Sequence, residues 1–337
     1  MKALTDMKIG KVPENVLKRS VIKQIHTRRE EVLLGAGVGE DCAAVKLAED
    51  ETLVMSTDPI TGTVHDIGTL AIQITVNDLA SAGAEPIGVL LTVLLPETVE
   101  EPELKKMMAE IEEACAKTNI QVVGGHTEVT AAVTQPVISV CGVGKVKDGQ
   151  LVSTAGARPG MDILVTKWIG IEGTSILAKE KEQELLTRFA QPFLDKAKAM
   201  DQYLSVLPEA AVAVQSGVAA MHDVTEGGIF GALWEMAEAS GVGLEIDLKK
   251  IPIRQETVEI CEFFGLNPYQ LISSGCMLMA SGDGNRLVRE LNLAHIPAAV
   301  IGKATEGNDR VLWNEEERRF LEPPKTDELY KVSVANT

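Results

Sequence analysis

The sequence predicts a mixed α/β (α+β) protein of two domains, and three observations lead to this prediction. Its 337 residues are long for one domain and sufficient for two. Aliphatic runs of strand length alternate with helical patterns along the chain. A stretch rich in Gly, Ser and Thr, from Lys147 to Pro159, interrupts this alternation. We therefore expect an N-terminal domain over residues 1–148 and a C-terminal domain over residues 149–337.

In the first domain, apolar spacing predicts helices and the short aliphatic runs predict strands. The clearest helix covers 103–118, because its apolar residues recur on one face. The expected helices are 16–25, 66–82 and 103–118, and the expected strands are 52–56, 87–95, 121–123 and 137–146.

The second domain repeats these element types, without a sequence repeat strong enough to indicate duplication. We expect strands over 162–166, 219–221, 244–246, 277–280 and 298–301. We expect helices over 174–184, 192–216, 228–239, 256–264 and 285–291.

Charge and composition disfavour several classes of function. There are 32 Lys and Arg against 49 Asp and Glu, which gives a net charge of −17. Such a chain is repelled by nucleic acids and anionic lipid surfaces. No apolar run reaches the length of a membrane span, and the first ten residues lack the apolar core of a signal peptide. The five cysteines form no CxxC pair. We expect a cytoplasmic protein with reduced cysteines.

Five short segments place a carboxylate or an imidazole where a strand or turn meets glycine or a helix start. They are Gly39-Glu40-Asp41, Thr57-Asp58, Asn77-Asp78, Gly124-Gly125-His126-Thr127-Glu128 and His222-Asp223-Val224-Thr225-Glu226-Gly227-Gly228. Glycines let the backbone approach phosphate groups, and carboxylates are the ligands that Mg²⁺ prefers. The combination suits a metal–triphosphate site, although the sequence has no Walker A motif.

Each of these residues also has a purely structural explanation. Asp58 precedes a proline and suits a turn. Asp78 could face solvent from its helix, and His126 could be a hydrogen-bonded core histidine. Asp223 could cap the helix that follows it. The five segments taken together favour a site.

The same segments resemble a superfamily of ATP-dependent synthases and kinases, which contains AIR synthase, thiamine-monophosphate kinase, selenophosphate synthetase and the hydrogenase maturation factor HypE. Gly39 to Val45 resembles the GDDAAV segment of HypE and the kinase. The run from Thr75 to Pro86, TVNDLASAGAEP, is very similar to a HypE segment and is the most specific match. Val123 to Glu128 resembles GGDT or GGET, and Met221 to Gly228 resembles RDPTRGG. The order of motifs holds from about residue 8 to 305.

This resemblance implies an AIR synthase-like N-terminal domain, which pairs with its copy in a homodimer to form a β-barrel, and an AIR synthase-like C-terminal domain. It implies ATP and Mg²⁺ as cofactors, with Asp41, Asp58 and Asp78 holding the metal. Gly39, Gly124, Gly125 and Thr127 would contact the nucleotide from the first domain. Thr225, Gly227 and Gly228 would close the site from the second domain. Asp78, His126 and Asp223 are the expected catalytic residues.

Four positions depart from the HypE pattern. His126 replaces a carboxylate, and an imidazole is a weaker ligand for Mg²⁺. Glu128 and Glu226 stand where HypE has a lysine and an arginine. Ser274 replaces the glutamate of an ASEG segment. The HypE tail ends in a cysteine that receives a carbamoyl group, whereas no cysteine follows Cys276 here. The resemblance therefore implies a different substrate.

Three functions remain open from the sequence. The first is a HypE-like, AIR synthase-related enzyme that activates a small-molecule substrate by Mg-assisted phosphoryl transfer from ATP to oxygen. The second is a small-molecule kinase similar to thiamine-monophosphate kinase. The third is a non-catalytic nucleotide-binding protein in a maturation assembly, with a maturation partner protein. Glu128 and Glu226 favour the third.

Overall fold

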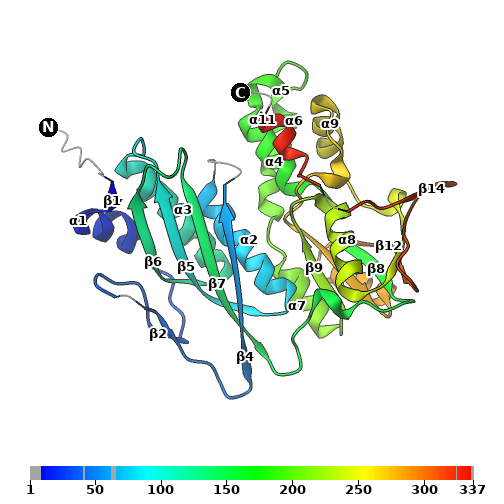
Figure 1. The fold of residues 1–337 in the computed structure, drawn as a ribbon, viewed down its shortest axis with the longest axis horizontal. Helices are drawn as coiled ribbons and strands as arrows, with labels where there is room; N and C mark the ends of the chain where they lie inside the picture. Colours follow the sequence, from blue (N-terminus) through cyan, green and yellow to red (C-terminus); the bar gives the residue numbers. More distant parts are fainter. Residues whose placement is uncertain (1–8, 41, 62–65, 324, 335–337) are drawn as a thin grey trace. The chain divides into compact units, whose positions relative to one another are not determined.

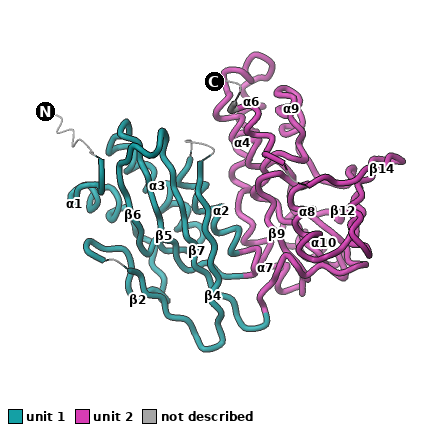
Figure 2. The backbone as a smooth tube through the Cα atoms, viewed as in Figure 1, with its two compact units in different colours: residues 1–79, 84–149 teal, residues 80–83, 150–337 magenta. Residues whose placement is uncertain are grey.

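The computed structural model describes residues 9–40, 42–61, 66–323 and 325–334. The chain divides into two compact units (Figure 2). Unit 1 contains residues 1–79 and 84–149, and unit 2 contains residues 80–83 and 150–337. Figure 1 labels the elements in chain order. Mixed helices and strands fill both units, which confirms the predicted fold class.

Unit 1 is built on a five-stranded sheet of order β1-β6-β5-β7-β4. β5 and β6 run parallel, and the other neighbours are antiparallel. The strands are β1 (Gly10–Lys11), β4 (Glu51–Ile60), β5 (Glu85–Leu95), β6 (Gln121–Val129) and β7 (Val137–Lys147), and a separate pair joins β2 (Val32–Leu34) to β3 (Ala44–Val45).

One face of this sheet carries the helix α2 (Ile67–Ser81). Gly142 of β7 lies so close to Thr75 of α2 that a side chain at position 142 would clash. Gly68 of α2 lies similarly close to the backbone carbonyl of Met107, in α3 (Glu101–Thr118). Small residues thus allow α2 to pack tightly against both the sheet and α3.

The expected N-terminal helix over 16–25 is irregular. It consists of α1 (Glu14–Val16), a π-helical turn η1 (Leu17–Val21) and a 3-10 turn η2 (Ile22–Gln24). Several strands are longer than expected, because pairing with neighbours extends β4 and β6 beyond their apolar runs.

Unit 2 is built on a seven-stranded sheet of order β14-β13-β10-β12-β8-β11-β9. Its strands are β8 (Asp162–Thr166), β9 (Ala220–Val224), β10 (Gly243–Asp247), β11 (Cys276–Ser281), β12 (Ala298–Thr305), β13 (Arg310–Asn314) and β14 (Glu317–Phe320). The hairpin of β13 and β14 was not expected, and the charged residues of β14 carry no alternating apolar pattern.

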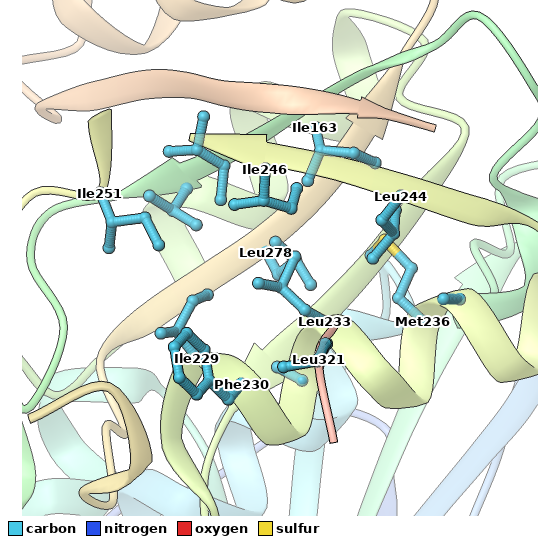
Figure 3. Close-up of a cluster of buried hydrophobic side chains, with 14 of the residues drawn as sticks. Ile163, Ile229, Phe230, Leu233, Met236, Leu244, Ile246, Ile251, Leu278 and Leu321 are labelled. Atoms are coloured by element: carbon cyan, nitrogen blue, oxygen red, sulfur yellow. The ribbon is translucent and has the colours of Figure 1, made fainter. Parts of the chain in front are cut away.

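Helices cover both faces of this sheet, as alternate residues of β11 show. Leu278 packs with Leu233 of α8 (Gly228–Ser240) in one cluster (Figure 3). Met277 and Met279 pack on the other side with residues of α7 (Leu207–Gln215) and α10 (Gly284–Leu293). Burial on both faces explains why β11 is apolar at almost every position.

The remaining helices form a further apolar cluster. They are α4 (Ile171–Glu180), α5 (Glu182–Leu185), α6 (Gln191–Lys198), α9 (Gln255–Phe264) and the C-terminal α11 (Leu329–Val334). The helical stretch expected over 192–216 is broken, because a 3-10 turn η4 (Ala199–Tyr203) and three further residues separate α6 from α7.

Candidate functional site

Two predicted metal ligands lie on the same face of the sheet in unit 1. The hydroxyl of Ser56, on β4, donates a hydrogen bond to the Asp78 carboxylate, on α2. Asp58 comes two residues after Ser56 and therefore points to the same face of β4. Asp58 and Asp78 are both half-buried. This geometry brings two oxygen-rich side chains from distant segments to one edge strand.

The double glycine lies inside a strand rather than in a turn. The sequence predicted that the strand ends at residue 123, but β6 continues to Val129. Gly125 has φ +145°, and a side chain there would clash with the Leu91 backbone of β5. Gly125 pairs with Leu91 of β5, which pairs in turn with Val140 of β7, and Val140 pairs with Asp58 of β4. Gly125 and Asp58 therefore lie in one row across the sheet. Strand packing therefore requires glycine at position 125.

His126 points to the other face of the sheet. His126 lies in a row across the sheet with Thr92, Ser139 and Pro59, which is adjacent to the row of Asp58. Successive side chains of a strand point to opposite faces, so the two rows face opposite sides. The His126 Nε2 lies 3.0 Å from a carboxylate oxygen of Glu128, and both side chains are about a third exposed, at 39% and 33%. Within unit 1, the sheet therefore separates His126 from Asp58 and Asp78. The next residue, Thr127, points to the face that α2 covers, and it is buried.

A cavity of about 100 Å³ adjoins the double glycine. Its lining combines the predicted nucleotide residues Gly124, Gly125 and Thr127 with apolar side chains. Glycines and Glu40 of the loop before Asp41 line it as well, together with Cys42. Sites for whole small-molecule ligands usually measure roughly 300–1,000 Å³, so this cavity has room only for part of a nucleotide.

Gly39 is the first residue of the Gly39-Glu40-Asp41 segment. It has φ +80° and open space around it, so the turn itself requires glycine there. Asp41, the third predicted metal ligand, lies outside the described residues. In the parts of the chain that are described, no three His, Cys, Asp or Glu side chains are arranged to hold a metal ion.

Unit 2 supplies the second group of predicted residues, at the point where β9 ends and α8 begins. Asp223 lies on β9 and is buried, with 6% of its surface exposed. Its neighbour His222 contacts Glu235 of α8, with 2.8 Å between Nε2 and the carboxylate. Thr225 is half-buried in the loop that follows.

The double glycine of this segment begins α8. Gly228 has φ +60°, and a Cβ there would lie 2.7 Å from the carbonyl oxygens of Tyr269 and Leu271. Gly227 donates its backbone N–H to the Asp327 carboxylate over 2.7 Å. Asp327 also accepts the N–H of Leu329 over 2.8 Å. An anion at this helix N-terminus would meet a carboxylate that already occupies one of the donors.

Carboxyl groups gather around this helix N-terminus. Glu226 accepts a hydrogen bond from the Tyr330 hydroxyl over 2.7 Å, and this bond raises the pKa of Tyr330 to about 12. Burial raises the pKa of Asp327, although the N–H groups that it accepts lower it in part. Burial also raises the pKa of Glu172, on α4, to about 7.

Sequence reasoning missed three residues of these groups: Ser56, Glu172 and Asp327. Ser56 directly precedes the Thr-Asp segment, so its place in a strand could have indicated it. Glu172 and Asp327 carried no signal, since each lies far along the chain from the β9–α8 segment that it approaches.

Two family signatures together cover most of the chain. The N-terminal domain of the AIR synthase related proteins matches residues 39–146, and the C-terminal domain matches residues 158–314. A putative hydrogenase expression/formation protein of Methanocaldococcus jannaschii is 30% identical over 334 residues, which is 96% of this chain and 97% of that protein. The chain belongs to the AIR synthase-related family.

Other members of the AIR synthase-related family are also similar. The carbamoyl dehydratase HypE of Cupriavidus necator is 31% identical over 74% of this chain and 72% of its own length. A crystal structure of HypE in complex with ATP superposes with a TM-score of 0.80 at 23% identity, over 97% of this chain and 98% of that one.

Two further crystal structures share the fold of this family member. A HypE–HypF complex aligns with a TM-score of 0.70 at 22% identity, over 81% of this chain and 90% of that one. Thiamine-monophosphate kinase of Stenotrophomonas maltophilia aligns with a TM-score of 0.73 at 20% identity, over 92% and 99%. None of the helices in the described ranges is long and apolar enough to cross a membrane.

Proposed function

We propose that this protein is a Mg·ATP-dependent enzyme that activates a small substrate by phosphoryl transfer to one of its oxygens. The observation that carries the proposal is the placement of Asp58 and Asp78 on one face of β4, with Ser56 bonded to Asp78. Similarity over nearly the whole length of a hydrogenase expression/formation protein supports it, as does the shared fold with a HypE structure that contains ATP.

The residues on the helix-covered face fit a magnesium ion bound together with a nucleotide. Mg²⁺ usually takes one or two protein carboxylates and completes its octahedron with water and phosphate oxygens. Asp58 and Asp78 would supply those carboxylates, with Asp41 as the third ligand that the sequence suggests. A bound Mg²⁺ would neutralise charge on the transferring phosphate. Ser56 would fix the orientation of Asp78.

A homodimer through unit 1 is part of this proposal. Leu53 and Met55 of the edge strand β4 point away from α2, because they alternate with Ser56 and Asp58. They are 48% and 60% exposed, and an edge strand with exposed apolar residues invites pairing with another chain. Replacing both with serine should shift a dimer to a monomer in analytical ultracentrifugation, whereas Leu293→Ser, at an exposed leucine of unit 2, should not.

We also propose a domain boundary near residue 148 and a cytoplasmic location. A maturation partner protein is a further part of the proposal. The fold shared with the HypE–HypF complex supports a partner protein. Affinity capture of the full chain from its own cells, followed by mass spectrometry, tests for one. Absence of a hydrogenase maturation protein from the captured set would contradict the partner.

The decisive experiment is a thermal-shift titration with Mg·ATP and Mg·ADP, followed by product analysis. Ligands that bind the native state raise the melting temperature by mass action. The proposal expects stabilisation by Mg·ATP, and ADP or AMP formation only with a particular co-substrate. Direct formation of thiamine diphosphate would favour the kinase. Binding without turnover for any co-substrate would favour the non-catalytic protein, and absence of binding would overturn all three.

A further inference from the structure

Gln121 is a buried polar side chain to which none of the predicted roles is assigned. It is the first residue of β6, and only 4% of its surface is exposed. A buried amide is costly unless its polar atoms are hydrogen-bonded. The Oε1 atom of Gln121 accepts the backbone N–H of Arg29 over 2.7 Å. Gln121 therefore ties the segment before β2 to the start of β6, three residues before the double glycine.

Other polar contacts hold the segment around Arg29. Glu112 of α3 accepts both the backbone N–H and the hydroxyl of Thr27, over 2.5 and 2.7 Å. The Arg29 guanidinium donates to the carbonyl oxygens of Asn119, over 2.9 Å, and Pro86, over 3.1 Å. These partners belong to α3, to the turn after it and to β5. The segment is thus fixed before the chain enters β2 and the glycine-rich loop that follows.

The glycine-rich loop after β2, residues 35–40, begins directly on the side chain of Gln121. A Cβ atom at position 35 would lie 2.9 Å from the Gln121 Nε2, and Gln121 cannot move away without losing its bond to Arg29. Gly35 does not have a positive φ, so this close contact and not the backbone conformation requires glycine there. The loop and the double glycine of β6 line the same cavity. Gln121 therefore lies where the loop meets the strand.

We propose that Gln121 is a positioning residue, which holds the loop 35–40 against the double glycine of β6 so that a nucleotide meets the loop already in place. The inference rests on the proposed function, because it takes the loop and the double glycine as contacts of Mg·ATP. Gln121 acts through Arg29 and Gly35 and takes part in no bond change. A loop that is ordered before binding does not cost binding energy to order it.

Gln121→Met tests the bond to Arg29, because methionine has a similar length but no strong acceptor. The loop should then hold its position in about a tenth of the molecules, which weakens the apparent affinity for Mg·ATP about tenfold. Isothermal titration calorimetry measures this affinity, and thermal unfolding without nucleotide measures stability. Ser175→Ala, which removes the hydrogen bond from a buried serine to the Lys198 carbonyl in unit 2, is the matched control. It should lower the melting temperature and leave the affinity unchanged.

A double-mutant cycle separates positioning from a general loss of stability. Gly35→Ala pushes against the Gln121 amide and should weaken Mg·ATP binding by a similar factor. Gln121→Ala removes that amide, so adding Gly35→Ala to it should weaken binding little further, and the two losses should not multiply. Gly35→Ala combined with Ser175→Ala should give the two separate effects, because these positions lie in different units.

Circular dichroism establishes that each variant is folded, and Gly35→Ala tests the contact from the loop even where position 121 tolerates no substitution. Unchanged Mg·ATP affinity in Gln121→Met or in Gly35→Ala, whatever the melting temperature, would overturn this inference and leave the proposed function intact. Losses of affinity in Gly35→Ala and Gln121→Ala that multiply would do the same. Absence of Mg·ATP binding to the wild type would overturn both.

Discussion

The carboxyl groups of the candidate site in unit 1 and those at the start of α8 in unit 2 lie in opposite environments. In unit 1, Asp58 and Asp78 are half-buried on a sheet face, beside the hydroxyl of Ser56. In unit 2, Glu172 and Asp327 are almost fully buried at a helix N-terminus. Burial raises the pKa of both of these carboxyl groups. The first environment suits ionised metal ligands, and the second suits groups that hold protons.

This contrast assigns different chemistry to the two sheets. Strand alternation in unit 1 directs acids to a face where a cation can reach them. Packing in unit 2 withdraws acids from water, and desolvation disfavours their charge. Substitutions in the unit 1 group should therefore change the affinity for nucleotide. Substitutions in the unit 2 group should change how the free energy of unfolding depends on pH.

The largest expected effect is on metal-dependent binding in unit 1. Asp78→Ala removes a proposed Mg²⁺ ligand and should abolish stabilisation by Mg·ATP in thermal-shift titrations. Ser56→Ala removes only the group that orients Asp78, and such changes typically cost about 10- to 100-fold in metal affinity. Thr52→Ala, earlier on the same strand, is the control. Unchanged affinity of Asp78→Ala would refute the metal site.

The next effect is on folding stability at the start of α8. Gly228→Ala combines a positive φ with a clash against two carbonyl oxygens, and should lower the free energy of unfolding by about 2–5 kcal/mol. Gly241→Ala, at the other end of α8, also has a positive φ but meets no atom within 4 Å. It should cost only about 1–2 kcal/mol. Urea denaturation compares the two, and equal losses would contradict the clash.

A smaller effect concerns the dependence of stability on pH in unit 2. The pKa of Glu172 is raised to about 7 in the folded protein, so folding is opposed as the pH rises from about 4.5 through 7. Glu172→Gln should remove this loss and increase the free energy of unfolding at pH 8 by about 2–3 kcal/mol, relative to its effect at pH 4.5. Urea denaturation at both pH values gives the difference, and parallel pH profiles would contradict it.

The smallest effect is the reverse case in unit 1. The guanidinium of Arg29 lowers the pKa of Glu31 to about 2, so this pair stabilises the fold above pH 4.5 and the benefit fades as the pH falls toward 2. Because a glutamine oxygen can still accept a hydrogen bond from Arg29, Glu31→Gln should cost only about 1 kcal/mol at pH 7 and almost nothing at pH 2. Chemical denaturation at the two pH values checks this, with Glu113→Gln on exposed α3 as the control.

Local patterns in the sequence predicted most regular elements. The bounds of β8 agree with the prediction, and α3 begins two residues earlier than expected. α3 has strong apolar periodicity, and β8 is a short continuous aliphatic run. β14 was missed because all four of its residues are exposed, and only pairing with β13 makes it a strand. Likewise, the continuation of β6 through Gly124 and Gly125 depends on hydrogen bonds to β5. Local propensity carries no information about such a partner.

The sequence by itself determined the family, the fold class and the segments that supply candidate ligands. These follow from motifs and periodicities that lie within a dozen residues of one another. Only the tertiary structure decided that Ser56 meets Asp78, that the sheet separates His126 from Asp58, and that Glu172 is buried. The physical reason is that strand register and helix packing set which distant side chains meet, and how far each is removed from water.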